Sequence, residues 1–165
     1  MKPRSLIPIL AIAAVSMATA LVFAQPKPAT TDSAEQAIRN AVLETNAKMA
    51  KAADHLDIEG FFSFILDTDK GSIVHNGTVF KSRQEAKEAV KQGFMGVEKM
   101  QRQFVNPQVT VISPEAALLT SEGTLAATLT DGRTMEGRFA VSLVFVRKDG
   151  EWKLLHGHYS APARM

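Results

Sequence analysis

The C-terminal segment Trp152–Ser160, with the sequence WKLLHGHYS, combines an apolar run with two histidines and a serine. Side chains alternate between the two faces of a β-strand. A regular strand therefore places five side chains on one face, in the order Trp152, Leu154, His156, His158 and Ser160. The pattern predicts a strand whose first half packs in the core and whose second half begins a pocket, with Tyr159 on the opposite face.

Three further long strands are expected before this segment. Turn signals divide residues 103–160 into strands of roughly 103–112, 116–129, 134–147 and 151–160, which is typical of an antiparallel meander. If Asp149–Gly150 is a two-residue loop, the pairs across the last hairpin are Phe145 with Leu154, Leu143 with His156, and Val141 with His158.

The residues before the strands predict three helices and a small hairpin. Asp32 and Ser82 each precede an amphipathic stretch and are followed three residues later by a glutamate, which is the pattern of a capping box. A second, short helix is expected after Asp57, and Asn76–Gly77 is a strong hairpin signal. We therefore predict an α+β domain in which a cone-shaped, curved antiparallel sheet of four long strands, plus the hairpin, packs against three N-terminal helices.

The N-terminal residues are typical of an export signal. Lys2 and Arg4 precede an apolar run, and cleavage is expected after Ala24. We expect residues 1–24 to be a signal peptide, 25–31 a flexible tether and 32–161 the domain, and the protein to be periplasmic or secreted. The alternative is an uncleaved membrane anchor, because Ser5–Ala24 is an uncharged stretch of 20 residues.

Composition excludes several classes of protein. The chain has no cysteine, so disulfides and a lipid anchor on cysteine are excluded. It carries 19 Lys and Arg against 17 Asp and Glu, and loss of Lys2 and Arg4 with the leader leaves 17 against 17. A neutral domain without a basic stripe is not expected to bind nucleic acid.

The order of these elements, and the closing motif Asp149–Ser160, resemble the nuclear transport factor 2-like superfamily. The chain is most similar to the SnoaL-like branch and to the association domain of calcium/calmodulin-dependent kinase, over Asp32 to Ser160. The resemblance implies a cone-shaped fold. It implies no single activity, since the superfamily includes isomerases, cyclases, dehydratases, transport adaptors and oligomerisation hubs. Kinase association domains tend to carry an arginine where this chain has Tyr159, so their carboxylate site is not implied here.

His158 and His156 are the candidate catalytic residues, as an acid/base pair. The alternative is that both are buried histidines that satisfy hydrogen bonds. A third ligand at a suitable spacing is missing, so neither a metal nor another cofactor is predicted. The residues expected to line a cavity or contact a ligand are His75, Phe62, Val141, Leu143, Trp152, Leu154 and Ser160.

The sequence places no carboxylate clearly inside the cone. Glu122 alternates to the outer face, where it can pair with Arg138. The first hypothesis is therefore an exported, non-catalytic binding or assembly domain for a small, largely apolar ligand, which forms a homodimer through the outer sheet face. The alternative is a small isomerase, dehydratase or cyclase that uses His158 with His156 or His75. A membrane is a partner only if the leader is retained.

Overall fold

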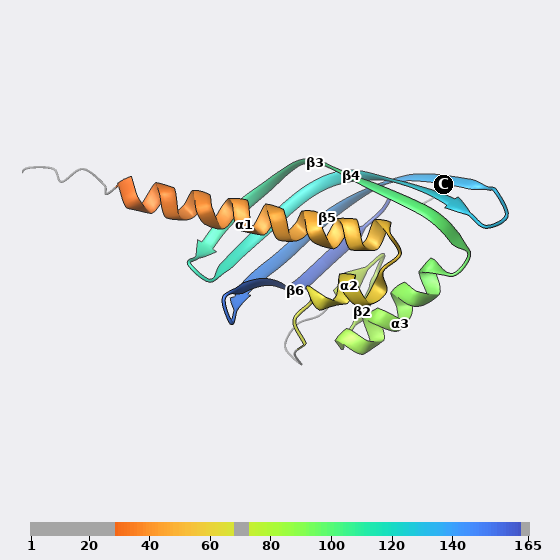
Figure 1. Ribbon diagram of the computed structural model, residues 1–165, viewed down its shortest axis with the longest axis horizontal. Coiled ribbons are helices and arrows are strands. Elements are labelled where there is room, and N and C mark those ends of the chain that lie inside the picture. The colour runs from red at the N-terminus through yellow and green to blue at the C-terminus, as the bar shows by residue number, and fades with distance from the viewer. Residues whose placement is uncertain (1–28, 68–72, 163–165) are drawn as a thin grey trace, which may run out of the picture.

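The computed structural model describes residues 29–67 and 73–162, and it confirms the α+β architecture (Figure 1). The elements are α1 (Ala29–Asp54), α2 (Ile58–Ser63), β1 (Ile73–His75), β2 (Thr78–Phe80), α3 (Arg83–Phe94), β3 (Val97–Ser113), β4 (Ala116–Leu129), β5 (Thr134–Lys148) and β6 (Glu151–Ser160). The predicted leader, and the tether as far as residue 28, lie outside the described residues. No helix in the described ranges is both long and apolar enough to span a bilayer.

The six strands form one curved, unclosed sheet in the order β2-β1-β6-β5-β4-β3. Strands β3 to β6 are the predicted antiparallel meander, and β1 joins its edge by pairing in parallel with β6. An irregularity between Val105 and Gln108 interrupts β3, where Asn106 adopts a left-handed backbone with φ of 46°. Such bulges bend a strand, and here the long strands curve over the helices (Figure 1).

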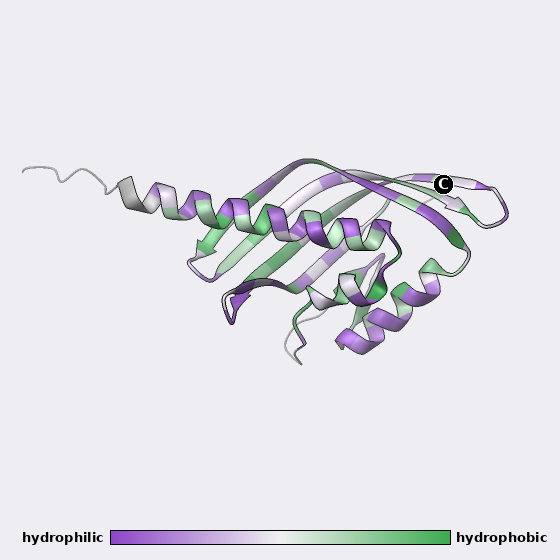
Figure 2. Cartoon of the chain, in the orientation of Figure 1, coloured by the Kyte–Doolittle hydropathy of each residue, from purple (hydrophilic) through white to green (hydrophobic). Residues whose placement is uncertain are grey.

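The helices cover the concave face of this sheet. Helix α1 contacts β3, β4 and β6, and α2 contacts both α1 and α3. Figure 2 shows α1 alternating between hydrophobic and hydrophilic residues, as expected of a helix with one buried side. The fully buried side chains come from both layers and include Val42, Met49, Phe62, Leu119, Leu143, Phe145 and Leu154. Each such side chain contributes about 1.5–3 kcal/mol through removal of its surface from water.

Local signals place the starts of α2 and α3 correctly but miss the starts of α1 and β3. The Ser82 side chain caps α3 by accepting a hydrogen bond from the Glu85 N–H at 3.1 Å, and Asp57 caps α2 in the same way. The predicted start of the first helix at Asp32 is wrong, because α1 begins at Ala29. Asp32 therefore lies in the first helical turn, where its negative charge interacts favourably with the positive end of the helix dipole.

Both predicted two-residue hairpins are confirmed. Asn76 and Gly77 have φ of 46° and 83°, and Asp149 and Gly150 have φ of 52° and 84°. Positive φ at both central residues is the signature of a type I′ turn, which suits the twist of the flanking strands.

The predicted register of the last hairpin is wrong beyond Leu154. Phe145 pairs with Leu154 as expected, but Val144 pairs with His156, so that Leu155 has no partner on β5. This β-bulge reverses the alternation that follows it. Gly157 and Tyr159 therefore share the concave face with Leu154, while His156, His158 and Ser160 alternate to the convex face.

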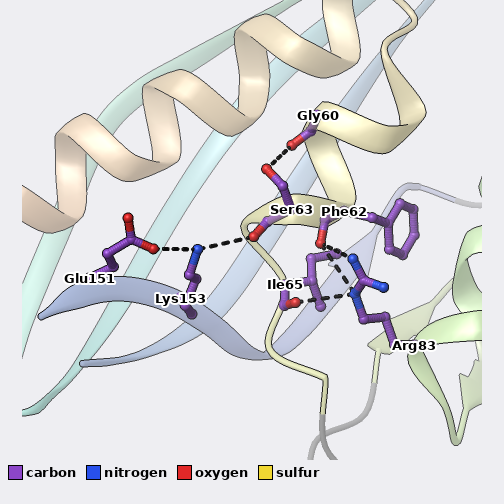
Figure 3. A network of polar contacts seen from close by, with 7 residues as sticks. All are labelled: Gly60, Phe62, Ser63, Ile65, Arg83, Glu151 and Lys153. Carbon is purple, nitrogen blue, oxygen red and sulfur yellow. Dashed lines mark hydrogen bonds and ion pairs between the residues drawn. The ribbon is translucent and has the colours of Figure 1, made fainter. Parts of the chain in front are cut away.

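Arg83 fixes the position of α2 (Figure 3). Its Nη2 donates to the carbonyl of Phe62 at 2.6 Å, and its Nε donates to the carbonyl of Ile65 at 3.2 Å. The Phe62 carbonyl also accepts the backbone N–H of Ile65 at 3.1 Å, so Arg83 adds a charged donor just where α2 ends. The guanidinium also lies 5.8 Å from the centre of the Phe62 ring. A single side chain of α3 therefore holds the end of α2 and the aromatic residue that α2 buries.

Lys153 makes a second connection to α2 from the opposite side (Figure 3). Its Nζ donates to the carbonyl of Ser63 at 3.2 Å and pairs with Glu151 at 2.7 Å. Together with Arg83, it ties α2 to both β6 and α3.

Candidate functional site

A cavity of about 650 Å³ lies between the concave face of the sheet and the three helices. Ligand pockets in proteins commonly have volumes of about 300–1,000 Å³. The walls are mainly apolar and include Met49, Phe61, Ile65, Phe80, Val90, Phe94, Met100, Phe104, Leu125 and Phe139.

The sheet side of the cavity is built around a glycine. The rings of Phe104 and Phe139 meet edge to face, with centroids 5.3 Å apart. Gly123, on the strand between them, leaves the space that the Phe139 ring occupies, since a Cβ there would stand 2.3 Å from Cζ of Phe139. The absent side chain therefore allows the Phe139 ring to lie against the backbone of Gly123.

Arg102 brings a positive charge to this apolar wall. Met100, Arg102 and Phe104 lie on the same face of β3, and all three line the cavity. The backbone N–H of Arg102 donates to Asp54 at 3.1 Å, and its Nη2 contacts the sulfur of Met100 at 3.0 Å. Burial lowers the pKa of Arg102, and the charges of Tyr159 and Asp54 oppose this shift. Arginine remains protonated at neutral pH.

Tyr159 brings a phenol to the same cavity. Burial raises the pKa of Tyr159 to about 12, while the nearby charge of Arg102 acts in the opposite direction. The phenol makes no hydrogen bond to another described residue. It is therefore a protonated donor at neutral pH.

Asn46 contributes a third polar group, from α1. The residue is only 6% exposed and lines the cavity, and its amide has no hydrogen bond within the described residues. No fully enclosed polar side-chain atom in the described part of the chain lacks a partner, so this amide is open to the cavity. Three elements far apart in the sequence thus supply Asn46, Arg102 and Tyr159 to one chamber.

His75 and Phe62, which the sequence predicted for the cavity, are part of its wall, and Ser160 borders the cavity although its position on β6 alternates to the convex face. Phe62 is 1% exposed, whereas His75 and Ser160 are exposed, and the His75 ring lies 3.4 Å from the Asn76 amide. Partial burial lowers the pKa of His75 from its ordinary value of 6.5.

The other predicted site residues lie elsewhere. His158 is exposed and His156 is half-buried, and both lie on the convex face. Their predicted inward placement is wrong, because the bulge at Leu155 reverses the alternation of side chains that follows it. Val141, Leu143 and Leu154 are buried in the core, and Trp152 is half-buried away from the chamber. The predicted outer ion pair is confirmed, with Arg138 Nη2 3.2 Å from Glu122 Oε2.

Residues 42–164 match the family model of the SnoaL-like domain. The chain belongs to the SnoaL-like family. No curated protein matches it.

Solved structures similar to this SnoaL-like domain share its nuclear transport factor 2-like fold. A proposed dehydratase of the NTF2-like family from Streptomyces avermitilis is 22% identical, with a TM-score of 0.68, over 76% of this chain and 97% of that one. A proposed scytalone dehydratase from Novosphingobium aromaticivorans is 12% identical, with a TM-score of 0.70, over 80% and 89%. The hexachlorocyclohexane dehydrochlorinase LinA-type3 from Novosphingobium barchaimii is 14% identical, with a TM-score of 0.67, over 80% and 91%. At these identities the likeness shows the fold alone, and the resemblance to the kinase association domain stays a prediction.

Sequence reasoning missed the three polar groups of the SnoaL-like cavity. The strand that carries Arg102 was expected to begin at Gln103, whereas β3 begins at Val97. Tyr159 was assigned to the outer face because the bulge was not foreseen. One signal was available, since a glycine inside a strand often marks a bulge, and Gly157 lies two residues beyond Leu155.

The described residues contain no group of three or more His, Asp or Glu side chains that could hold a metal ion. The polar residues of the cavity wall are Asn46, Arg102 and Tyr159, together with the exposed residues His75, Asn76, Glu136, Arg138 and Ser160.

Proposed function

We propose that this SnoaL-like domain binds one small, largely apolar molecule between its sheet and its helices. The observation that carries this proposal is the chamber of about 650 Å³, with aromatic walls and a few polar groups. Protein interiors are normally packed as closely as organic crystals. A chamber of this size gives up packing that would otherwise stabilise the fold, which is expected of a site that holds a ligand.

The uncharged fluorophore phenylnaphthylamine tests this proposal, because it brightens in apolar surroundings. Ala89 lines the cavity, so Ala89→Phe fills part of the chamber. Ala126 is exposed on the convex face, so Ala126→Phe is the matched control. Wild type and A126F are expected to bind the fluorophore, and A89F to bind it at least about 10-fold more weakly. Absence of binding to wild type, or equal binding to A89F, would contradict the proposal.

A second candidate is a small isomerase, dehydratase or cyclase. It is favoured by His75, whose lowered pKa keeps a neutral, basic imidazole beside the cavity at neutral pH. Structures of similar fold also carry the names dehydratase and dehydrochlorinase. The test is turnover of a panel of carbonyl and halogenated compounds by wild type and His75→Gln. Turnover that H75Q loses supports this candidate, and no turnover by wild type removes it.

We also propose that the convex sheet face forms a homodimer. Thr120 and Thr124 are exposed on this face of β4, where small polar side chains can be covered by a second copy. Thr120→Arg should lower the mass measured by analytical ultracentrifugation to that of a monomer. Thr130→Arg, in the exposed β4–β5 turn, should leave it unchanged. A wild-type monomer at micromolar concentration would exclude this assembly.

Export is the final part of the proposal, and it rests on the charged start and apolar run of residues 1–24. Mass spectrometry of the protein from its native source should find a chain that begins at Gln25. A chain that retains Met1 would instead support the membrane anchor.

A further inference from the structure

We propose that the cavity binds an amphiphilic carboxylate, whose charged group pairs with Arg102 and whose apolar body contacts the phenylalanine side chains. This inference rests on the proposed function and names the chemical class of its ligand. It comes from four properties of the described residues: an unpaired guanidinium, two further donors, the absence of competing acids, and the apolar remainder of the wall.

The Arg102 guanidinium has unused hydrogen-bonding capacity. An arginine side chain carries five N–H donors. Within the described residues, the only hydrogen bond of this side chain is from Nη2 to the Met100 sulfur at 3.0 Å, and a thioether is a weak acceptor. No carboxylate of the described residues lies within 4.0 Å of the guanidinium. A buried charge without a counter-ion is costly, so the cavity favours an anion at this point.

Asp54 does not fill this role. Its carboxylate accepts the backbone N–H of Arg102 at 3.1 Å and attracts the guanidinium, but Asp54 is not part of the cavity wall. It holds the backbone of Arg102 from the helix side and leaves the hydrogen-bonding capacity of the guanidinium to a ligand.

Tyr159 and Asn46 add neutral donors to the same chamber. The phenol of Tyr159 is close enough to Arg102 for each charge to act on the other group, and it makes no hydrogen bond within the described residues. The Asn46 amide is likewise open to the cavity. Donors outnumber acceptors among these groups, which complements a carboxylate.

Acidic side chains are almost excluded from the chamber. Glu136 is the only acidic residue among those described in the wall, and it alternates to the convex face, opposite Ala126. Arg138 also touches the cavity, but its guanidinium is engaged outside by Glu122 at 3.2 Å. Arg102 therefore supplies the one positive charge that is available to a ligand among the described wall residues.

A carboxylate fits these groups better than a phosphate does. One guanidinium offers one positive charge in a planar fork, which matches the two oxygens of a singly charged carboxylate. The rest of the wall is largely aromatic and aliphatic and suits a hydrocarbon or ring system.

The test compares two molecules of equal chain length, decanoate and decanol, as competitors of bound phenylnaphthylamine. Wild type should bind decanoate about 10- to 100-fold more tightly than decanol, because hydrogen bonds to a charged group are stronger than neutral ones. Arg102→Gln should lose most of this preference while still binding the fluorophore, and Arg102→Lys should keep part of it. Arg133→Gln removes an exposed guanidinium in the β4–β5 turn and should behave as wild type.

Tyr159→Phe gives an independent reading, because it keeps the ring and removes only the hydroxyl. It should weaken decanoate binding by about 3- to 10-fold and leave decanol unaffected. Equal affinity of wild type for the two competitors, or an undiminished preference in both R102Q and Y159F, would overturn the carboxylate inference while leaving the apolar site intact. Failure of wild type to bind the fluorophore would instead defeat the proposed function itself.

Discussion

The ring of Phe139 lies directly against the backbone of Gly123, because a Cβ atom on Gly123 would stand 2.3 Å from Cζ of Phe139. The same Cβ would stand 2.6 Å from the carbonyl oxygen of Gln103 on the neighbouring strand. The packing of Phe104 and Phe139 on the sheet side of the cavity therefore depends on a residue that has no side chain. If any other residue replaced Gly123, both the Phe139 ring and the backbone carbonyl of Gln103 would have to move.

Gly123→Ala should destabilise the domain by about 1–3 kcal/mol, the usual cost of overpacking a core. Urea denaturation monitored by circular dichroism measures this. The control is Gly137→Ala on the adjacent strand, where an added Cβ would meet no atom within 4 Å. G137A should be neutral or slightly stabilising, since alanine restricts the unfolded chain. Equal stability of the two variants would refute the close contact.

Tyr159 is the only tyrosine in the chain, so an ultraviolet titration of phenolate reports its pKa alone. We expect a pKa of about 12 in the folded protein, because burial disfavours the charged form. Arg102→Gln should raise the pKa of Tyr159 further, since the Arg102 charge lowers it in wild type. An ordinary value near 10, unchanged in R102Q, would place the phenol in water.

The same shift predicts a loss of stability in alkali. The folded pKa of Tyr159 is raised above its ordinary value of 10.0, so the unfolded chain loses the phenolic proton first. Stability from this group is complete below about pH 10 and falls as the pH rises towards 12. Tyr159→Phe should flatten this part of the profile in chemical denaturation. A slope that persists in Y159F would have to come from other groups.

His75 makes the opposite prediction in mild acid. Partial burial lowers the pKa of His75 below its ordinary value of 6.5, so the unfolded chain takes up the proton first as the pH falls. Stability from the neutral imidazole is complete above about pH 6.5 and declines below it, towards the folded pKa. Thermal denaturation at about pH 7.5 and pH 5 measures the decline. His75→Gln should lose less stability between the two pH values than wild type does.

Arg83→Met should destabilise the domain by about 2–3 kcal/mol, because it leaves the carbonyls of Phe62 and Ile65 without their charged donor. Arg133→Met removes an exposed ion pair with Asp131 and should cost about 0–1 kcal/mol. Denaturant midpoints at one pH compare the two. If R83M is no less stable than R133M, α2 must be held by its apolar contacts alone.

The parts of the fold that follow from local chemistry could be predicted from the sequence. A serine with a glutamate three residues later defines the start of α3, and Asn76–Gly77 and Asp149–Gly150 define two tight turns. These signals act over a few residues and do not depend on distant contacts. The strand order of the meander follows from the turns.

The site could not be predicted in the same way, because the bulge in β6 depends on distant segments. Leu154 donates its N–H to Phe64 and accepts the N–H of Leu66, whereas Gly157 pairs with Ile73 on β1. Two separate stretches thus meet the free edge of β6 on either side of Leu155. Alternation read along one strand contains no information about such partners, and the histidines were consequently assigned to the wrong face.

The unpaired Leu155 has a consequence for how this protein can change over generations. The bulge shifts the alternation of side chains by one residue. Beyond it, His156 and His158 face the convex side of the sheet and Tyr159 faces the concave side. Substitutions of His156 or His158 alter the exterior of the sheet, whereas substitutions of Tyr159 alter the chamber. Mutation and selection can therefore remodel the exterior and the interior independently, within a strand of 10 residues.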